Sequence, residues 1–138
     1  MTTAKLRHIA ISVPDLEASA AFYEQAFGLQ RVNFVVTPYG DGLSLSDGVI
    51  NLTLLKFHTD DAAGDERGKD FVGIHHMGFI VDDLEAMSEK IKASGGTFHR
   101  ELKGGNGVDF ERKFRDPNGI DFFRSEEHTS ELQSPAMI

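Results

Sequence analysis

The chain has 138 residues, a hydrophobic fraction of 40% and a charged fraction of 26%, which are typical of one soluble globular domain or two small modules. It has no cysteine, so disulfides, thiolate zinc sites and a cysteine nucleophile are excluded. The net charge of −8 argues against nucleic acid as a partner. No apolar run approaches the ~20 residues that cross a bilayer, and the N-terminus lacks the form of a signal peptide. We therefore expect a cytoplasmic protein without a membrane partner.

The first predicted module spans residues 4–57. It begins with an alternating apolar run, "LRHIAISV", which indicates a strand that contains His8. Asp15 follows as a candidate helix N-cap, and the apolar residues after it recur at helical spacing. Three strand candidates come next, "QRVNFVV", "GLSLSDG" and "VINLTLLKF". The module therefore has the predicted order βαβββ.

A second copy of this pattern appears when the chain is shifted against itself by about 68 residues. His8 then lies over His76, and Asp15 lies over Asp83, which is again a candidate N-cap. The charged stretch 58–70 is predicted to be a linker, and the second module covers 71–123. Its strand candidates are "GIHHMGFIV", "GTFHREL", "VDFERKF" and "NGIDFF". The predicted fold class is α+β, with two tandem βαβββ modules that form a curved mixed sheet cup, a natural place for a small molecule.

The last segment, residues 124–138, differs from the rest of the chain. It has no hydrophobic period, and "RSEEHTSELQS" resembles the conceptual translation of a common short-read sequencing adapter. We expect an artefactual, disordered tail, and His128 within it is given no role. On this interpretation the natural C-terminus is missing.

The duplicated pattern carries a family resemblance. The stretches "HIAISVPDLEASAAFYEQAFGL", "GIHHMGFIVDDLEA" and "KFRDPNGIDFF" resemble the vicinal oxygen chelate superfamily, which includes glyoxalase I, bleomycin-resistance proteins and extradiol dioxygenases. The resemblance covers residues 5 to 123. It implies the fold more specifically than the reaction, because this superfamily runs several reactions on one scaffold.

In metal-dependent members of the superfamily, four strand positions supply the ligands. The resemblance places His8 and His76 at two of them, and neutral imidazole suits Zn, Ni, Fe or Mn. Asn51 and Phe123 occupy the other two, where metal-using relatives have carboxylates. Without that negative charge a divalent cation loses most of its Coulombic stabilisation, and an amide cannot serve as the base of a glyoxalase I reaction. Asn51 is then a weak ligand or a substrate contact, and Phe123 is a candidate substrate contact.

Other polar residues have weaker claims to a role. Asp121 shares strand parity with Phe123 about 6.6 Å away, so a register shift makes it a candidate carboxylate of a dioxygenase-type site. Arg115 is a candidate substrate contact. His75, with parity opposite to His76, is predicted to face the helix side or solvent, and His58 and His99 are predicted to be surface residues.

Three functions follow from these features. The first is a glyoxalase-like lyase or isomerase that acts on a small oxygen-rich molecule with help from one divalent metal. The second is a metal-free small-molecule-binding protein of the bleomycin-resistance type, in which the same polar groups line an apolar pocket. The third is a dioxygenase-type site. The cofactor is accordingly one divalent metal or none, the partner is a small molecule, and we expect a homodimer.

Overall fold

The computed structural model describes residues 4–64, 67–103 and 109–126. The described residues fall into two compact units, a first unit of residues 8–75 and a second unit of residues 4–7 with 76–126. Both α-helices and strands are present in each unit, so the α+β prediction is confirmed. No helix in the described ranges is long and apolar enough to cross a membrane.

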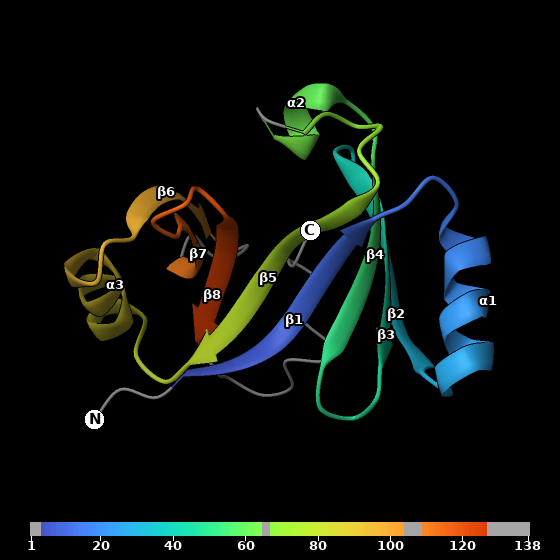
Figure 1. Ribbon diagram of the computed structural model, residues 1–138, viewed down its shortest axis with the longest axis horizontal. Helices are drawn as coiled ribbons and strands as arrows, with labels where there is room; N and C mark the ends of the chain where they lie inside the picture. The colour runs from blue at the N-terminus through green and yellow to red at the C-terminus, as the bar shows by residue number, and fades with distance from the viewer. Residues whose placement is uncertain (1–3, 65–66, 104–108, 127–138) are drawn as a thin grey trace. The chain divides into compact units, whose positions relative to one another are not determined.

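The first unit contains a four-stranded arrangement with one covering helix (Figure 1). The strand order is β2-β3-β4-β1, in which β1 and β4 are parallel and the other pairs are antiparallel. The mixed sheet of the prediction is therefore confirmed in this unit. The elements are β1 (Ala4–Ser12), of which residues 4–7 belong to the second unit, α1 (Leu16–Phe27), β2 (Gln30–Val36), β3 (Gly40–Ser46) and β4 (Asn51–Phe57).

Helix α1 begins and ends where local chemistry predicts. Asp15 is the N-cap, and its carboxylate accepts a hydrogen bond from the Ala18 amide at 3.0 Å. Gly28 closes the helix in a left-handed conformation, φ 71°, in which its N–H donates to the Glu24 carbonyl. The helix packs on one sheet face through a core of buried and half-buried apolar residues, namely Ile11, Val13, Leu16, Ala20, Tyr23, Leu29, Leu43, Leu45 and Leu54.

The predicted linker, residues 58–70, is partly structured. It contains one helical turn, α2 (Asp60–Ala63), which Thr59 caps by accepting a hydrogen bond from the Ala62 amide at 3.1 Å. Ala63 is buried in a small apolar cluster with Ala10, Leu55 and Phe57 on the sheet face opposite α1. The turn forms because its cap and its buried alanine hold it against β4.

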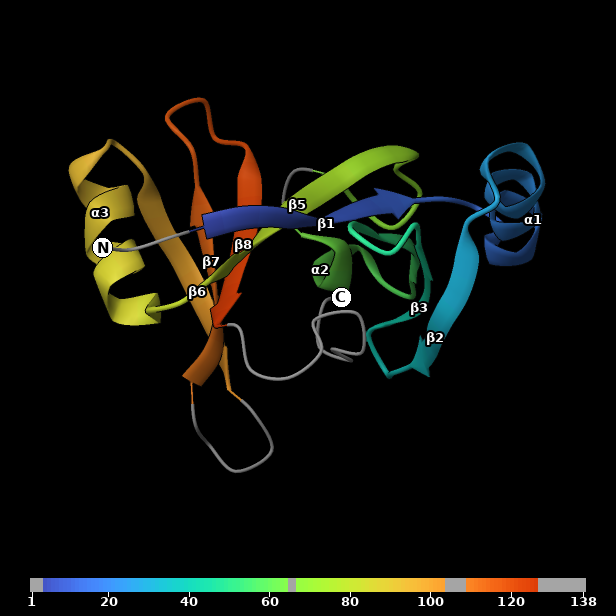
Figure 2. The same cartoon turned by 90° about the horizontal axis from the view of Figure 1, so that it is seen from below.

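The second unit repeats the order of elements (Figure 2). Its strand order is β5-β8-β7-β6, with β5 and β8 parallel. Asp83 caps its helix as Asp15 caps α1, with the Ala86 amide 3.0 Å from the carboxylate. The elements are β5 (Gly73–Val81), α3 (Leu84–Ala93), β6 (Thr97–Lys103), β7 (Asp109–Arg115) and β8 (Asp121–Glu126).

Strand β8 differs from its prediction at both ends. A turn at Asp116 precedes the strand, since its carboxylate accepts hydrogen bonds from the amides of Asn118 and Ile120. The strand starts at Asp121 and runs to Glu126, three residues into the segment that the sequence assigns to a tail. Residues 127–138, including His128, lie outside the described part of the chain.

Candidate functional site

A row of hydrogen-bonded polar side chains crosses three strands of the first unit. His8 of β1 and Asn51 of β4 are partners in the parallel pairing, are 0% and 2% exposed, and share a side-chain hydrogen bond. The Thr53 hydroxyl donates to Asn51 Oδ1 at 2.7 Å and lies 2.9 Å from the Ser44 hydroxyl of β3. The structure therefore brings His8 and Asn51 together in a buried network.

Strand alternation decides which face carries this network. Ile11, Leu43 and Leu54 belong to the core under α1. Successive side chains on a strand point to opposite faces, so His8 and Asn51, which lie an odd number of residues away from Ile11 and Leu54, belong to the face opposite α1. Asn51 therefore lies outside the apolar core under α1, in a buried polar network on the opposite face of the sheet.

Burial keeps the His8 imidazole neutral at physiological pH. Removal from water lowers the pKa of His8 to about 4, and the hydrogen bond with Asn51 offsets only part of that effect. Neutral imidazole is a hydrogen-bonding group and a good metal ligand, but it supplies no charge.

The remaining predicted site residues belong to the second unit. His76 of β5 is 2% exposed, and Arg115 at the end of β7 is half-buried. The backbones of Asp121 and Phe123 lie in β8, while their side chains lie outside the described part of the structure. The roles of these four residues stay predictions.

The other histidines divide into surface and interior residues. His58 and His99 are exposed as predicted, and His58 Nε2 lies 3.2 Å from an Asp41 carboxylate oxygen. For His75 the solvent alternative is wrong, because the side chain is 8% exposed. Its Nε2 donates to the Ala63 carbonyl at 2.6 Å, and its ring centre lies 4.9 Å from that of Phe57. The helical turn α2, which sequence reasoning did not anticipate, provides this partner.

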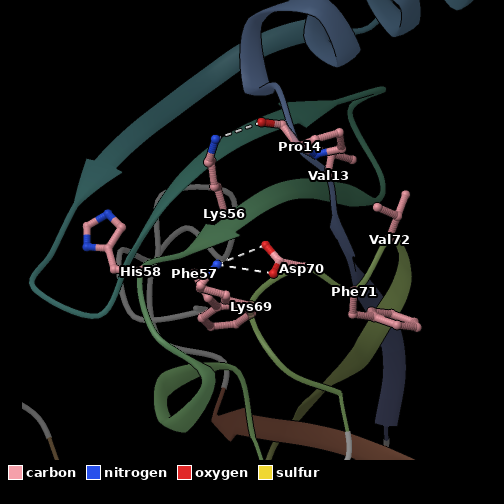
Figure 3. Close-up of a pocket in the computed structure, with 9 residues that line it drawn as sticks. All are labelled: Val13, Pro14, Lys56, Phe57, His58, Lys69, Asp70, Phe71 and Val72. Carbon is pink, nitrogen blue, oxygen red and sulfur yellow. Dashed lines mark hydrogen bonds and ion pairs between the residues drawn. The ribbon is translucent and has the colours of Figure 1, made fainter.

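A cavity of about 550 Å³ opens at the far end of β4 in the first unit (Figure 3). Asn51 begins this strand and Phe57 ends it, so the cavity lies about 20 Å along the strand from the polar network. Its Lys56 donates to the Pro14 carbonyl at 2.9 Å, and its Lys69 pairs with Asp70 at 3.1 Å. None of the predicted site residues is among those lining the cavity, which are Val13, Pro14, Lys56, Phe57, His58, Lys69, Asp70, Phe71 and Val72.

The described donors do not by themselves fit a divalent metal. Within the described ranges, no three His, Cys, Asp or Glu side chains gather closely enough to hold a metal ion. His8 fits as a neutral nitrogen ligand, but the Asn51 oxygen already accepts the Thr53 hydroxyl. An imidazole and an amide carry no negative charge to offset the dehydration of a divalent cation.

Comparison with known proteins identifies the family. The model of the Glyoxalase/Bleomycin resistance protein/Dioxygenase superfamily matches residues 5–122. The chain belongs to this superfamily. Over 116 residues it is 31% identical to a probable lactoylglutathione lyase of Vibrio parahaemolyticus, covering 76% of this chain and 79% of the relative. Over 99 residues it is 30% identical to an ethylmalonyl-CoA/methylmalonyl-CoA epimerase of Cereibacter sphaeroides, covering 66% and 71%.

Two solved structures show the same fold. A hypothetical protein from Bacillus halodurans superposes with a TM-score of 0.75 at 20% identity, over 93% of this chain and 97% of that one. Methylmalonyl-CoA epimerase from Mycobacterium tuberculosis superposes with a TM-score of 0.70 at 19% identity, over 89% and 87%. At these identities the likeness establishes the fold of this superfamily member and not its reaction.

Sequence reasoning missed three residues of the polar faces. Thr53 and Ser44 complete the network around Asn51, and Lys113 of β7 is only 7% exposed. Alternation could have found Thr53, which lies two residues after Asn51 on the same face. No sequence signal indicates that Lys113 is buried, because lysine in a strand is ordinarily a surface residue.

Proposed function

We propose that this superfamily member binds a small oxygen-rich molecule against the sheet face opposite α1, with His8 and Asn51 as the groups that orient it. His76 of the second unit is a further candidate for the same role. The proposal is carried by the buried, neutral hydrogen bond between His8 and Asn51. Imidazole and amide groups form directional hydrogen bonds to carbonyl and hydroxyl oxygens, which is what a binding site for such a molecule needs.

A second polar group on this face supports binding. The Ser12 hydroxyl of β1 is buried and has no hydrogen-bond partner among the described residues. A buried hydroxyl without a partner is costly, so a group from outside the chain, a ligand atom or a bound water, would stabilise it. Apolar side chains of Ala10 and Leu55 lie on the same face and supply the hydrophobic surroundings typical of small-molecule sites.

The metal-free form of this function agrees best with the donors. His8 and Asn51 lack a carboxylate, and an amide cannot act as the general base of a glyoxalase I reaction at neutral pH. The proposal is therefore of the bleomycin-resistance type, in which the pocket binds the molecule without a resident divalent metal.

The second candidate is a lyase or isomerase assisted by a divalent metal. It is favoured by the relatives at 31% and 30% identity, which are named as a lactoylglutathione lyase and a CoA-ester epimerase. This candidate, like the dioxygenase-type alternative, requires a carboxylate from β8, for which Asp121 is the candidate on the sequence. The metal would then polarise substrate oxygens, and His8 and His76 would hold it.

Metal analysis of the purified protein separates the two candidates. After saturation and desalting we expect about 0.2 equivalents or less of Zn, Ni, Fe or Mn, since neutral donors bind divalent cations weakly. We expect Asn51→Glu to bind metal more tightly, because it restores the carboxylate that metal-using relatives place there. Asn118→Glu, in the exposed turn after β7, is the matched control and should leave metal content unchanged. One equivalent of metal in the wild type, lost in His8→Ala and in His76→Ala, would favour the metal-assisted candidate instead.

A further inference from the structure

The cavity at the end of β4 is separate from the polar network, and its described lining residues all belong to the first unit (Figure 3). Its volume of about 550 Å³ is within the range of sites that hold small organic molecules. The proposed function uses none of these lining residues. Their contacts indicate the chemistry of a molecule that fits the cavity.

One aromatic wall of the cavity, Phe71, is held in place by two neighbours. The guanidinium carbon of Arg67 lies 4.8 Å from the centre of the Phe71 ring, a cation–π contact, and Arg67 also donates to the Ile74 carbonyl at 2.8 Å. A Cβ atom at Gly73 would lie 3.1 Å from the ring, so glycine lets the ring pack closely against the backbone. The position of the Phe71 ring is therefore defined before a ligand enters.

The second aromatic wall, Phe57, is held from the side of the sheet. It is 6% exposed, and its ring centre lies 4.9 Å from that of His75. A Cβ atom at Gly40 would lie 3.1 Å from the Phe57 Cα, so glycine there permits β3 to approach this residue closely. Val13 and Val72 add aliphatic groups to the lining. Because both aromatic walls are preformed, a ring can enter the cavity without first ordering these side chains.

One positive charge of the lining is not met by an acidic group. The Lys56 ammonium donates to the Pro14 carbonyl at 2.9 Å, and it pairs with no carboxylate within the described ranges. A carbonyl is neutral, so Lys56 keeps its charge and two further N–H donors. The Lys69 ammonium, by contrast, lies 3.1 Å from each carboxylate oxygen of Asp70, so these two charges meet each other. The lining thus offers a cation to a ligand, in a chain whose net charge is −8.

We propose that this cavity is a second binding site, which takes a small molecule with an aromatic body and one anionic group. The aromatic body packs against Phe57 and Phe71, and the anionic group accepts hydrogen bonds from the exposed Lys56 ammonium. Aromatic rings pair favourably with one another, and a charge-assisted hydrogen bond is stronger than a neutral one. The inference stands apart from the proposed function, because the cavity lies about 20 Å along β4 from Asn51.

Naphthoate and its neutral isostere naphthamide are the probes, at constant ionic strength. We expect isothermal titration calorimetry to detect naphthoate binding to the wild type, and an affinity lower by about tenfold or more in Lys56→Met, since a charge-assisted hydrogen bond is lost. Naphthamide should bind these two proteins alike. Lys56→Arg keeps the charge and should retain most of the naphthoate affinity. Lys90→Met, at an exposed lysine of α3, is the matched control and should bind naphthoate as the wild type does.

The aromatic wall is tested by Phe71→Ala, which should weaken both probes by about threefold or more, since a ring–ring contact is lost. Phe27→Ala, at a phenylalanine that is 67% exposed at the end of α1, should weaken neither. Circular dichroism establishes that the variants are folded, and Lys56→Arg tests the charge should Lys56→Met unfold.

Three results would overturn the inference. They are a wild type that does not bind naphthoate, equal naphthoate affinity in wild type and Lys56→Met, and a loss in Lys90→Met as large as that in Lys56→Met. Asn51→Leu should leave naphthoate affinity unchanged. Naphthoate binding that is lost in Asn51→Leu and kept in Lys56→Met would assign the molecule to the polar network, which supports the proposed function while it removes the second site.

Discussion

The two units share an order of elements but present different groups on the sheet face opposite their helix. The first unit carries a neutral network, in which the Asn51 amide hydrogen-bonds to both His8 and Thr53. The second unit carries an imidazole and an ammonium, from His76 and Lys113. The repeat therefore determines helix capping and strand alternation, while the charge of each face is set by single residues.

The arginine hydrogen bonds and ion pairs that join helix to sheet also differ between the two units. In the first unit Arg31 of β2 bonds Glu17 and Glu24 of α1 with its side chain 39% exposed. In the second unit Arg112 of β7 bonds Glu85 and Ser88 of α3 with its side chain 14% exposed. The more buried guanidinium is less screened by water, so we expect Arg112 to contribute more to stability than Arg31 does.

The largest expected effect is the pH dependence of stability that His8 of the neutral network causes. His8 has a pKa of about 4 in the folded protein and the ordinary value of 6.5 when unfolded. Between these values the unfolded state binds more protons, so stability is complete above pH 6.5 and declines as the pH falls toward 4. The loss attributable to His8 is about 3 kcal/mol at 1.36 kcal/mol per pKa unit.

Urea unfolding at a series of pH values measures this loss. His8→Gln, which can still hydrogen-bond Asn51, should flatten the slope between pH 6.5 and 4. His58→Gln is the control, because His58 is an exposed surface residue. Wild type and His8→Gln with the same slope would mean that His8 is not held neutral by burial.

The next effect concerns the amide at the centre of the network. Asn51→Leu has a similar volume but removes the amide that accepts from the Thr53 hydroxyl and hydrogen-bonds the His8 imidazole. We expect a loss of about 1–3 kcal/mol in the free energy of unfolding, the cost of buried polar groups left unsatisfied. Asn118→Leu, in an exposed turn, should change stability by less than ~0.5 kcal/mol. A stabilised Asn51→Leu would show that the network is retained for binding at the expense of stability.

Replacing Arg31 and Arg112 in turn compares what each contributes to stability by joining a helix to its sheet. Arg112→Met should lower the free energy of unfolding by about 1 kcal/mol, since it removes hydrogen bonds from a mostly buried charged group. Arg31→Met should lower the free energy of unfolding by less, because the ion pairs of Arg31 are exposed. In 1 M salt the loss caused by Arg31→Met should shrink more than the loss caused by Arg112→Met. Thermal or denaturant unfolding of both variants at two salt concentrations is the measurement, and a costlier Arg31→Met would reverse the proposed ranking.

The smallest expected effect concerns the helix N-caps, a feature that the two units share. Asp15 and Asp83 each accept one amide hydrogen bond at 3.0 Å as N-caps. Asp15→Ala and Asp83→Ala should each cost about 1 kcal/mol, and the corresponding Asn variants should be nearly neutral, since asparagine caps as well as aspartate. Denaturant unfolding of the four variants would contradict this equivalence if one alanine variant were much costlier than the other.

Much of the fold was predictable because it depends on local patterns. Alternating runs identified the strands of both units, and aspartates at Asp15 and Asp83 identified the starts of α1 and α3. The superfamily was predictable from the order of these motifs and is confirmed by the family match over residues 5–122. Helix α2 and the true ends of β8 were missed, since a single capped turn and a strand partner are fixed by contacts distant in sequence.

The sequence by itself determined the alternation that puts His8 and Asn51 on one face and apolar residues on the other. The resemblance of its motifs to the superfamily also predicted that Asn51 stands where metal-using relatives have a carboxylate, and this stays a prediction. Only the tertiary structure decided that Thr53 and Ser44 bond to this amide, that His75 meets the Ala63 carbonyl, and that Lys113 is buried. The physical reason is that side-chain direction follows from the local backbone, whereas burial and hydrogen-bond partners depend on strands that the fold brings together from afar.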